Sequence, residues 1–183
     1  MDKLRESKDL LDLMIKYRTT CDDKAAIIIA VLGVMISAFL MMGGSDTIQM
    51  VRSIAEDPGW ASVLVIAVLI VSAALLIVGF YYLIITVIPI TGNAGCDEQE
   101  KDGLNLRSPV YFMGIAPLEY KEFNELFANR TDEEYQNDIL SEVYITSKAC
   151  VKKYRSFKLG VIIGGIGILL LLVAMVAGFM HTG

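Results

Sequence analysis

Histidine, cysteine and proline are scarce in this sequence. Among its 183 residues are one histidine, three cysteines and four prolines. The histidine, His181, lies at the extreme C-terminus, and the cysteines lack the paired spacing of zinc ligands. A phosphate-binding glycine loop ending in Lys-Ser/Thr and a nucleophile elbow are also missing. We therefore predict a protein that is not an enzyme and that has neither a metal site nor a cofactor.

Charge is also missing, from three long stretches. Residues 25–45, 58–96 and 159–183 contain no Asp, Glu, Lys or Arg, while 55% of the whole chain is hydrophobic. A bilayer core about 30 Å thick is crossed by roughly 20 apolar residues in a helix, and each stretch is at least that long. This pattern excludes a water-soluble enzyme built around one core and predicts three transmembrane helices. Because no charged residue lies within a span, an ion-coupled transporter is disfavoured.

The basic residues predict the orientation in the membrane. Of the 16 Lys and Arg, six precede the first stretch, one follows it, nine lie between the second and third, and none comes later. Positively charged loops stay in the cytoplasm, so we expect the N-terminus inside and the C-terminus outside. Residues 93–158 hold 12 acids against nine bases, which disfavours nucleic-acid binding.

Glycine and proline set the predicted segment boundaries. We expect the Gly43-Gly44-Ser45-Asp46 cluster to end the first long helix and Pro89 to end the second. The predicted segments are a cytoplasmic amphipathic helix 1–24, transmembrane helix 25–43, external loop 44–59, transmembrane helix 60–90, cytoplasmic helical region 91–158, transmembrane helix 159–180 and external tail 181–183.

Two helices are predicted to continue from the cytoplasm into the membrane. Thr131 and Glu134 have the spacing of a capping box. An apolar stripe then follows at spacings of 4, 4, 3, 4, 4 and 3, formed by Tyr135, Ile139, Val143, Thr146, Cys150, Tyr154 and Phe157. Nothing breaks this helix from Asp132 to about Phe179. The N-terminal helix carries its own stripe, formed by Leu4, Leu11, Met14 and either Tyr17 or Arg18. We expect the two stripes to pack together as an all-α bundle, with Cys21 and Cys150 buried.

The last span and its approach contain residues that suggest close packing and ligand binding. Gly160 and Gly164 allow helices to approach closely, either within one chain or between copies of a homo-oligomer. The basic cluster over residues 148–158 suits anionic lipid headgroups or a phosphate. Cations beside the Tyr111-Phe112 segment could hold a nucleotide. The residues predicted to bind such a ligand are Lys24, Arg107, Tyr111, Arg130, Lys152 and Arg155.

The order of several short segments resembles the Pycsar transmembrane effector family over about residues 5–180. These segments are Asp23-Lys24-Ala25-Ala26, then Pro109, Tyr111, Phe112 and Gly114-Ile115-Ala116, then Glu119-Tyr120, Tyr135 and Ile139, and finally Lys152-Lys153-Tyr154-Arg155. The resemblance implies a membrane effector of bacterial anti-phage defence. In such systems a cyclase makes a cyclic mononucleotide, cCMP or cUMP, upon infection. The effector then impairs the inner membrane, and infection is aborted.

The residues leave two other functions open. A scaffold membrane protein would use the apolar Tyr111–Ala116 segment to bind a cytoplasmic protein partner. A small oligomeric ion channel would line its pore with Ser37, Ser62, Ser72 or Thr86, although these side chains suit helix packing better.

Overall fold

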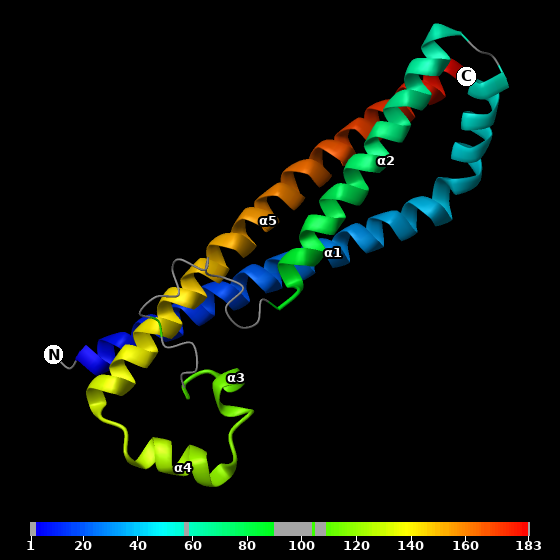
Figure 1. Ribbon diagram of the computed structural model, residues 1–183. Coiled ribbons are helices and arrows are strands. Elements are labelled where there is room, and N and C mark those ends of the chain that lie inside the picture. Colours follow the sequence, from blue (N-terminus) through cyan, green and yellow to red (C-terminus); the bar gives the residue numbers. More distant parts are fainter. Residues whose placement is uncertain (1–2, 57–58, 90–103, 105–108, 183) are drawn as a thin grey trace. The chain divides into compact units, whose positions relative to one another are not determined.

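A computed structural model describes residues 3–56, 59–89, 104 and 109–182. Five helices make up this part of the chain: α1 (Lys3–Glu56), α2 (Trp60–Val87), α3 (Phe112–Ile115), α4 (Tyr120–Ala128) and α5 (Asp132–Thr182) (Figure 1). The described residues contain no strand, so the predicted all-α class is confirmed.

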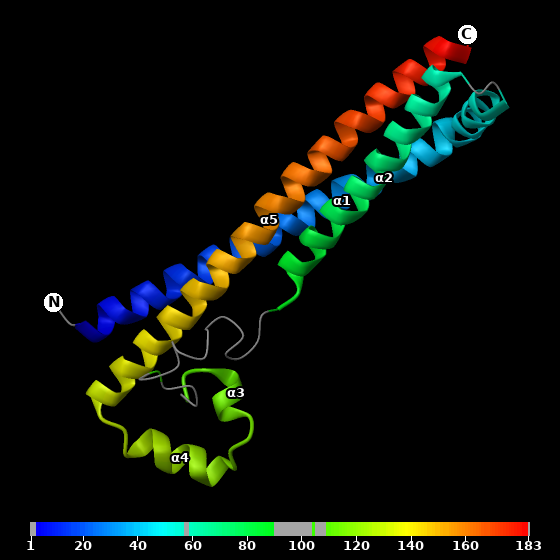
Figure 2. The same cartoon turned by 45° about the horizontal axis from the view of Figure 1, so that its top comes forward.

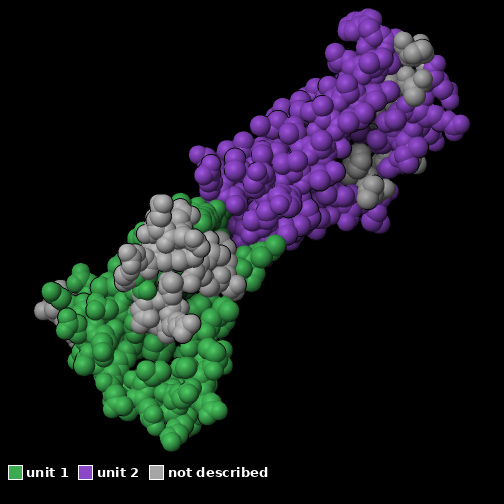
Figure 3. Space-filling view, in the orientation of Figure 1, with its two compact units in different colours: residues 1–22, 88–154 green, residues 23–87, 155–183 purple. Residues whose placement is uncertain are grey.

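The chain divides into two compact units, which are coloured separately in Figure 3. Unit 1 comprises residues 1–22 and 88–154, and unit 2 comprises residues 23–87 and 155–183. Both boundaries fall inside long helices: α1 is helical on either side of Asp22 and α5 on either side of Tyr154. The prediction of one helix from Asp132 to about Phe179 is therefore confirmed.

The prediction that Gly43–Asp46 ends the first helix is wrong. α1 continues through these residues to Glu56, so most of the predicted 44–59 loop is helical. A helix interior glycine costs only about 1 kcal/mol relative to alanine, which weakens a helix without stopping it. Gly44 does not adopt the left-handed conformation that glycine usually provides just beyond a helix end.

The other helix ends follow their local sequence. α2 stops at Val87, two residues before Pro89, because a proline disfavours helical backbone in the preceding residue. The Thr131 capping box is confirmed: the Thr131 N–H donates to Glu134 Oε2 (2.9 Å), and the Glu134 N–H donates to Thr131 Oγ1 (3.2 Å). A second capping box, between Glu119 and Glu122, opens α4.

Small residues pack α2 closely against α5 within unit 2 (Figures 1 and 2). A Cβ added to Gly79 would lie 2.6 Å from the backbone nitrogen of Gly164, so the two backbones are almost in contact. Ser62, Ser72 and Thr86 are buried on α2. The hydroxyls of Ser72 and Thr86 donate to carbonyls of their own helix. These three residues therefore serve helix packing, the alternative that the sequence favoured over a pore.

Unit 2 also carries many exposed apolar side chains. Among the described residues, two helical stretches are long and apolar enough to cross a membrane, Trp60–Val87 and Asp132–Gly178. Only 17% of the most apolar part of the first and 22% of that of the second is buried. Val34 on α1, Ile77 on α2 and Leu169 on α5 are each more than 60% exposed. Helices of a soluble core would bury such residues.

Candidate functional site

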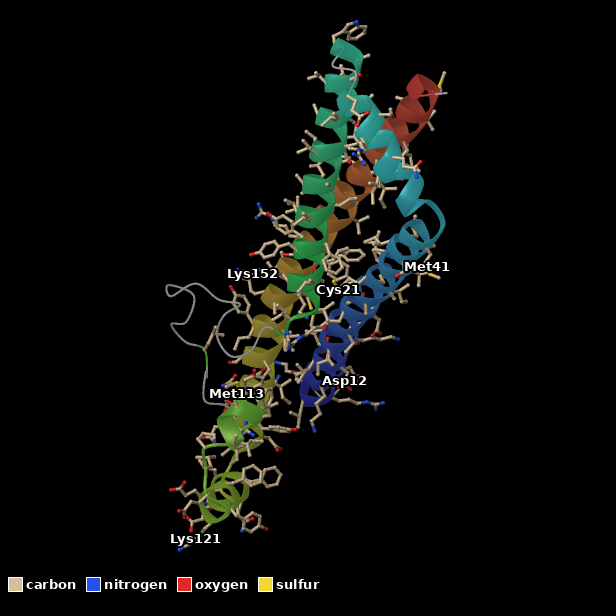
Figure 4. The ribbon with its side chains drawn as sticks, turned by 90° about the vertical axis from the view of Figure 1, so that its right-hand side faces the viewer. Asp12, Cys21, Met41, Met113, Lys121 and Lys152 are labelled. Atoms are coloured by element: carbon tan, nitrogen blue, oxygen red, sulfur yellow. The ribbon has the colours of Figure 1, made fainter. Side chains whose placement is uncertain are left out.

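Unit 1 brings the N-terminal part of α1 alongside the first half of α5. Leu4, Leu11 and Met14 are half-buried, as the predicted stripe requires, and Ser7 and Cys21 extend the same face. Figure 4 labels Cys21, which is buried, and Asp12, which is exposed on another side of α1. On α5, Ile139, Thr146 and Cys150 are buried. Within unit 1 the two helices pack together as predicted, with Cys150 in contact with Met14, but Tyr154 of the predicted α5 stripe is exposed.

The contact between these helices is unusually polar. We call Arg18 and Asp22 on α1, with Glu142, Cys150 and Lys153 on α5, the polar seam. Lys153 is only 1% exposed and forms an ion pair with Asp22. The Cys150 thiol donates to the Met14 carbonyl at 3.6 Å. These pairs satisfy groups that would be costly to bury alone.

Two side chains of the polar seam have shifted pKa values. Burial raises the pKa of Glu142 above its ordinary value, although the positive charge of Arg18 lowers it in part. Burial likewise raises the pKa of the Cys150 thiol. Both shifts favour the neutral form, so unit 1 holds a carboxyl group and a thiol that resist ionisation.

Sequence reasoning missed the polar seam. The sequence places Lys153 in a lipid- or phosphate-binding cluster, and this interpretation is wrong, because Lys153 is buried and paired with Asp22. A signal was present, because Glu142, Thr146, Ala149 and Lys153 repeat at spacings of 4, 3 and 4. Charged residues at heptad core spacing predict buried polar pairs between helices.

A cleft of about 1290 Å³ opens between α4 and the start of α5 in unit 1. Apolar side chains of Leu118, Leu126, Leu140 and Tyr144 line part of it. Its carboxylates are Glu122, Glu125, Glu134 and Asp138. Hydrogen bonds from Thr131 lower the pKa of Glu134, which keeps that group ionised at neutral pH.

Arg130 is the cationic side chain of the cleft lining. Its guanidinium forms an ion pair with Asp138, and both side chains are at least 90% buried. The same guanidinium lies 4.6 Å from the ring centre of Tyr135, and Lys8 approaches that ring at 4.9 Å. Arg130 therefore joins α5 to the segment before it through contacts with Asp138 and Tyr135.

The described members of the predicted ligand set belong partly to unit 1 and partly to unit 2. Lys24 and Arg155 are exposed residues of unit 2. Lys152 is exposed in unit 1, and the half-buried Tyr111 packs its ring against Phe112 at 4.6 Å. Arg107 lies outside the described residues. Arg130 lines the cleft but is already paired with Asp138, so its contact with a phosphate stays a prediction.

Gly160 and Gly164 face α2 of the same chain. A Cβ on Gly160 would lie 2.9 Å from Leu83 Cγ and 3.0 Å from the Gly79 carbonyl oxygen. The structure thus shows the intrachain packing that the sequence left open. A role of these glycines in an oligomer stays a prediction.

The described helices define an all-helical class of protein, and two of them are long and apolar enough to cross a membrane. The described residues contain no group of three or more His, Cys, Asp or Glu side chains placed to hold a metal ion.

Residues 6–179 match the family model described as PycTM: Pycsar effector protein domain. The chain belongs to this family and is therefore a Pycsar anti-phage effector. No curated protein and no solved structure matches it.

Proposed function

We propose that the chain is a non-enzymatic effector of the bacterial inner membrane. In this proposal, cCMP or cUMP made upon phage infection triggers it to impair the membrane, so that infection is aborted. The observation that carries the proposal is the continuity of α1 and α5, which each join a charged segment of unit 1 to an apolar segment of unit 2 without a break in the helix. A change of packing in unit 1 could then be transmitted along rigid helices.

Three spans with the N-terminus inside are part of this proposal. The distribution of basic residues supports the orientation, and exposed apolar side chains on all three helices support contact with lipid. Ile48, on α1 and 70% exposed, would then face the outside, and Lys121 on α4 would face the cytoplasm. In a cysteine-free background, a membrane-impermeant maleimide should label Ile48→Cys on intact spheroplasts and Lys121→Cys only after lysis. Labelling of both on intact cells would refute the orientation.

The polar seam supports a two-state mechanism. Replacing buried ion pairs by apolar contacts is often neutral or stabilising, so a polar contact of this kind is not the most stable one available. We propose that the ligand, bound through Lys24, Arg107, Tyr111, Arg130, Lys152 and Arg155, changes the packing of α1 on α5 and rearranges a homo-oligomer. A ligand shifts such an equilibrium only by its different affinity for the two states.

Dye leakage from liposomes that contain the purified protein tests this function. We expect leakage with cCMP or cUMP, and none with cAMP or without nucleotide. Lys152→Gln should weaken the response, while Lys121→Gln, which changes another exposed lysine outside the predicted ligand set, should not. The proposal fails if no cyclic nucleotide causes leakage or raises the thermal stability of the protein.

A further inference from the structure

We propose that the cleft between α4 and α5 binds a basic, amphipathic helical segment of a partner protein. This proposal concerns a binding surface for a protein segment, and of its lining only Arg130 belongs to the residues proposed to bind the nucleotide. It rests on the size of the cleft, its exposed apolar lining and its charge.

The cleft is larger and more apolar than a small anion needs. Its volume of about 1290 Å³ exceeds the roughly 300–1,000 Å³ of most small-molecule pockets. Three of its apolar side chains are substantially exposed: Leu126 (51%), Leu140 (43%) and Tyr144 (38%). Apolar side chains exposed together between two helices are the usual feature of a groove that receives a third helix.

The negative charge of the cleft favours a positively charged occupant. Four carboxylates face one guanidinium there, and Asp138 already pairs with that guanidinium. Over residues 118–138 there are seven acids and two bases, a net charge of −5 that equals the net charge of the whole chain. The second base, Lys121, lies on α4 and does not line the cleft (Figure 4). Lysine or arginine side chains of a partner would be attracted to these carboxylates.

Shape and charge together favour a protein segment over a small cation. A small cation would leave the leucines and Tyr144 exposed to water. An amphipathic helix would cover them with one face and place flanking lysines or arginines beside Glu125 and Glu122. Complementary charge of this kind raises the association rate and sets specificity.

Fluorescence polarisation with a labelled model peptide tests the proposal. The probe is a 16-residue helical peptide of leucine and lysine with one apolar face, added to the full-length protein in nanodiscs of neutral phosphatidylcholine. We expect saturable binding that weakens with salt. A peptide of the same composition with its apolar face scrambled, and one with glutamate in place of lysine, should each bind at least tenfold more weakly.

Matched variants separate the cleft from general electrostatic attraction. Glu125 and Glu133 are both exposed, and Glu125 lines the cleft while Glu133 does not. We expect Glu125→Lys to weaken binding of the amphipathic peptide at least tenfold and Glu133→Lys less than threefold. Leu126→Asn should weaken binding without changing net charge. Equal effects of the two charge reversals would overturn the proposal, as would undiminished binding by the Leu126→Asn variant.

Discussion

Replacing Gly79 by alanine should force α2 and α5 apart. The new Cβ would lie 2.6 Å from the Gly164 nitrogen and 2.7 Å from its Cα, whereas ordinary contacts begin at 3.4 Å. The helices would therefore have to separate locally by up to about 0.8 Å, which is 3.4 Å less 2.6 Å. Both obstructing atoms belong to the backbone, so no side-chain rotation relieves the clash. Overpacking of this kind costs about 1–3 kcal/mol.

The free energy of unfolding in mixed micelles, followed by the fluorescence of the single tryptophan Trp60, measures this cost. Gly165→Ala is the matched control, because a Cβ there has no atom within 4 Å. We expect Gly79→Ala to lose about 1–2 kcal/mol relative to this control, since alanine's better helix propensity is common to both. If the two variants unfold at the same detergent concentration, the close approach of α2 and α5 is refuted.

Three further predictions concern the polar seam. Asp22→Asn should destabilise the protein by about 3 kcal/mol or more in the same unfolding assay, because Lys153 is left buried without a counter-charge. Lys153→Met should lower the free energy of unfolding by less, since Asp22 is 30% exposed and remains hydrated. Equal losses of stability in the two variants would contradict this reasoning. The raised pKa of Glu142 means that the folded state binds its proton more tightly, so stability should fall as pH rises above the ordinary value of 4.5. Glu142→Gln should reduce the dependence of the melting temperature on pH between pH 4 and 7. An unchanged dependence would argue against the burial of this carboxyl group. In a Cys96→Ser background, Cys150 should react slowly with N-ethylmaleimide until the protein is unfolded, because its thiol is buried and the pKa of that thiol is raised. Fast labelling of the native protein would instead show that this thiol lies at the surface.

Much of the helical architecture could be predicted from the sequence by itself. The Thr131 capping box, the 3- and 4-residue spacing along α5 and the long uncharged stretches depend on residues close in the chain. Such local patterns predict helices because backbone hydrogen bonds join residues four apart. The prediction that Gly43–Asp46 ends the first helix failed because the low helix propensity of glycine is only a weak effect. The backbone N–H and C=O groups there are satisfied by continuing the helix.

The tertiary structure alone decided which polar groups meet. Asp22 and Lys153 are 131 residues apart in sequence, and Arg130 forms an ion pair with Asp138. Gly160 and Gly164 are just as compatible with oligomer contacts as with the contact to Gly79 that the structure shows. A sequence pattern identifies the face of a helix that must be covered. Which element covers it depends on close packing between distant segments, where shifts of less than 1 Å decide whether two backbones or two charges fit together.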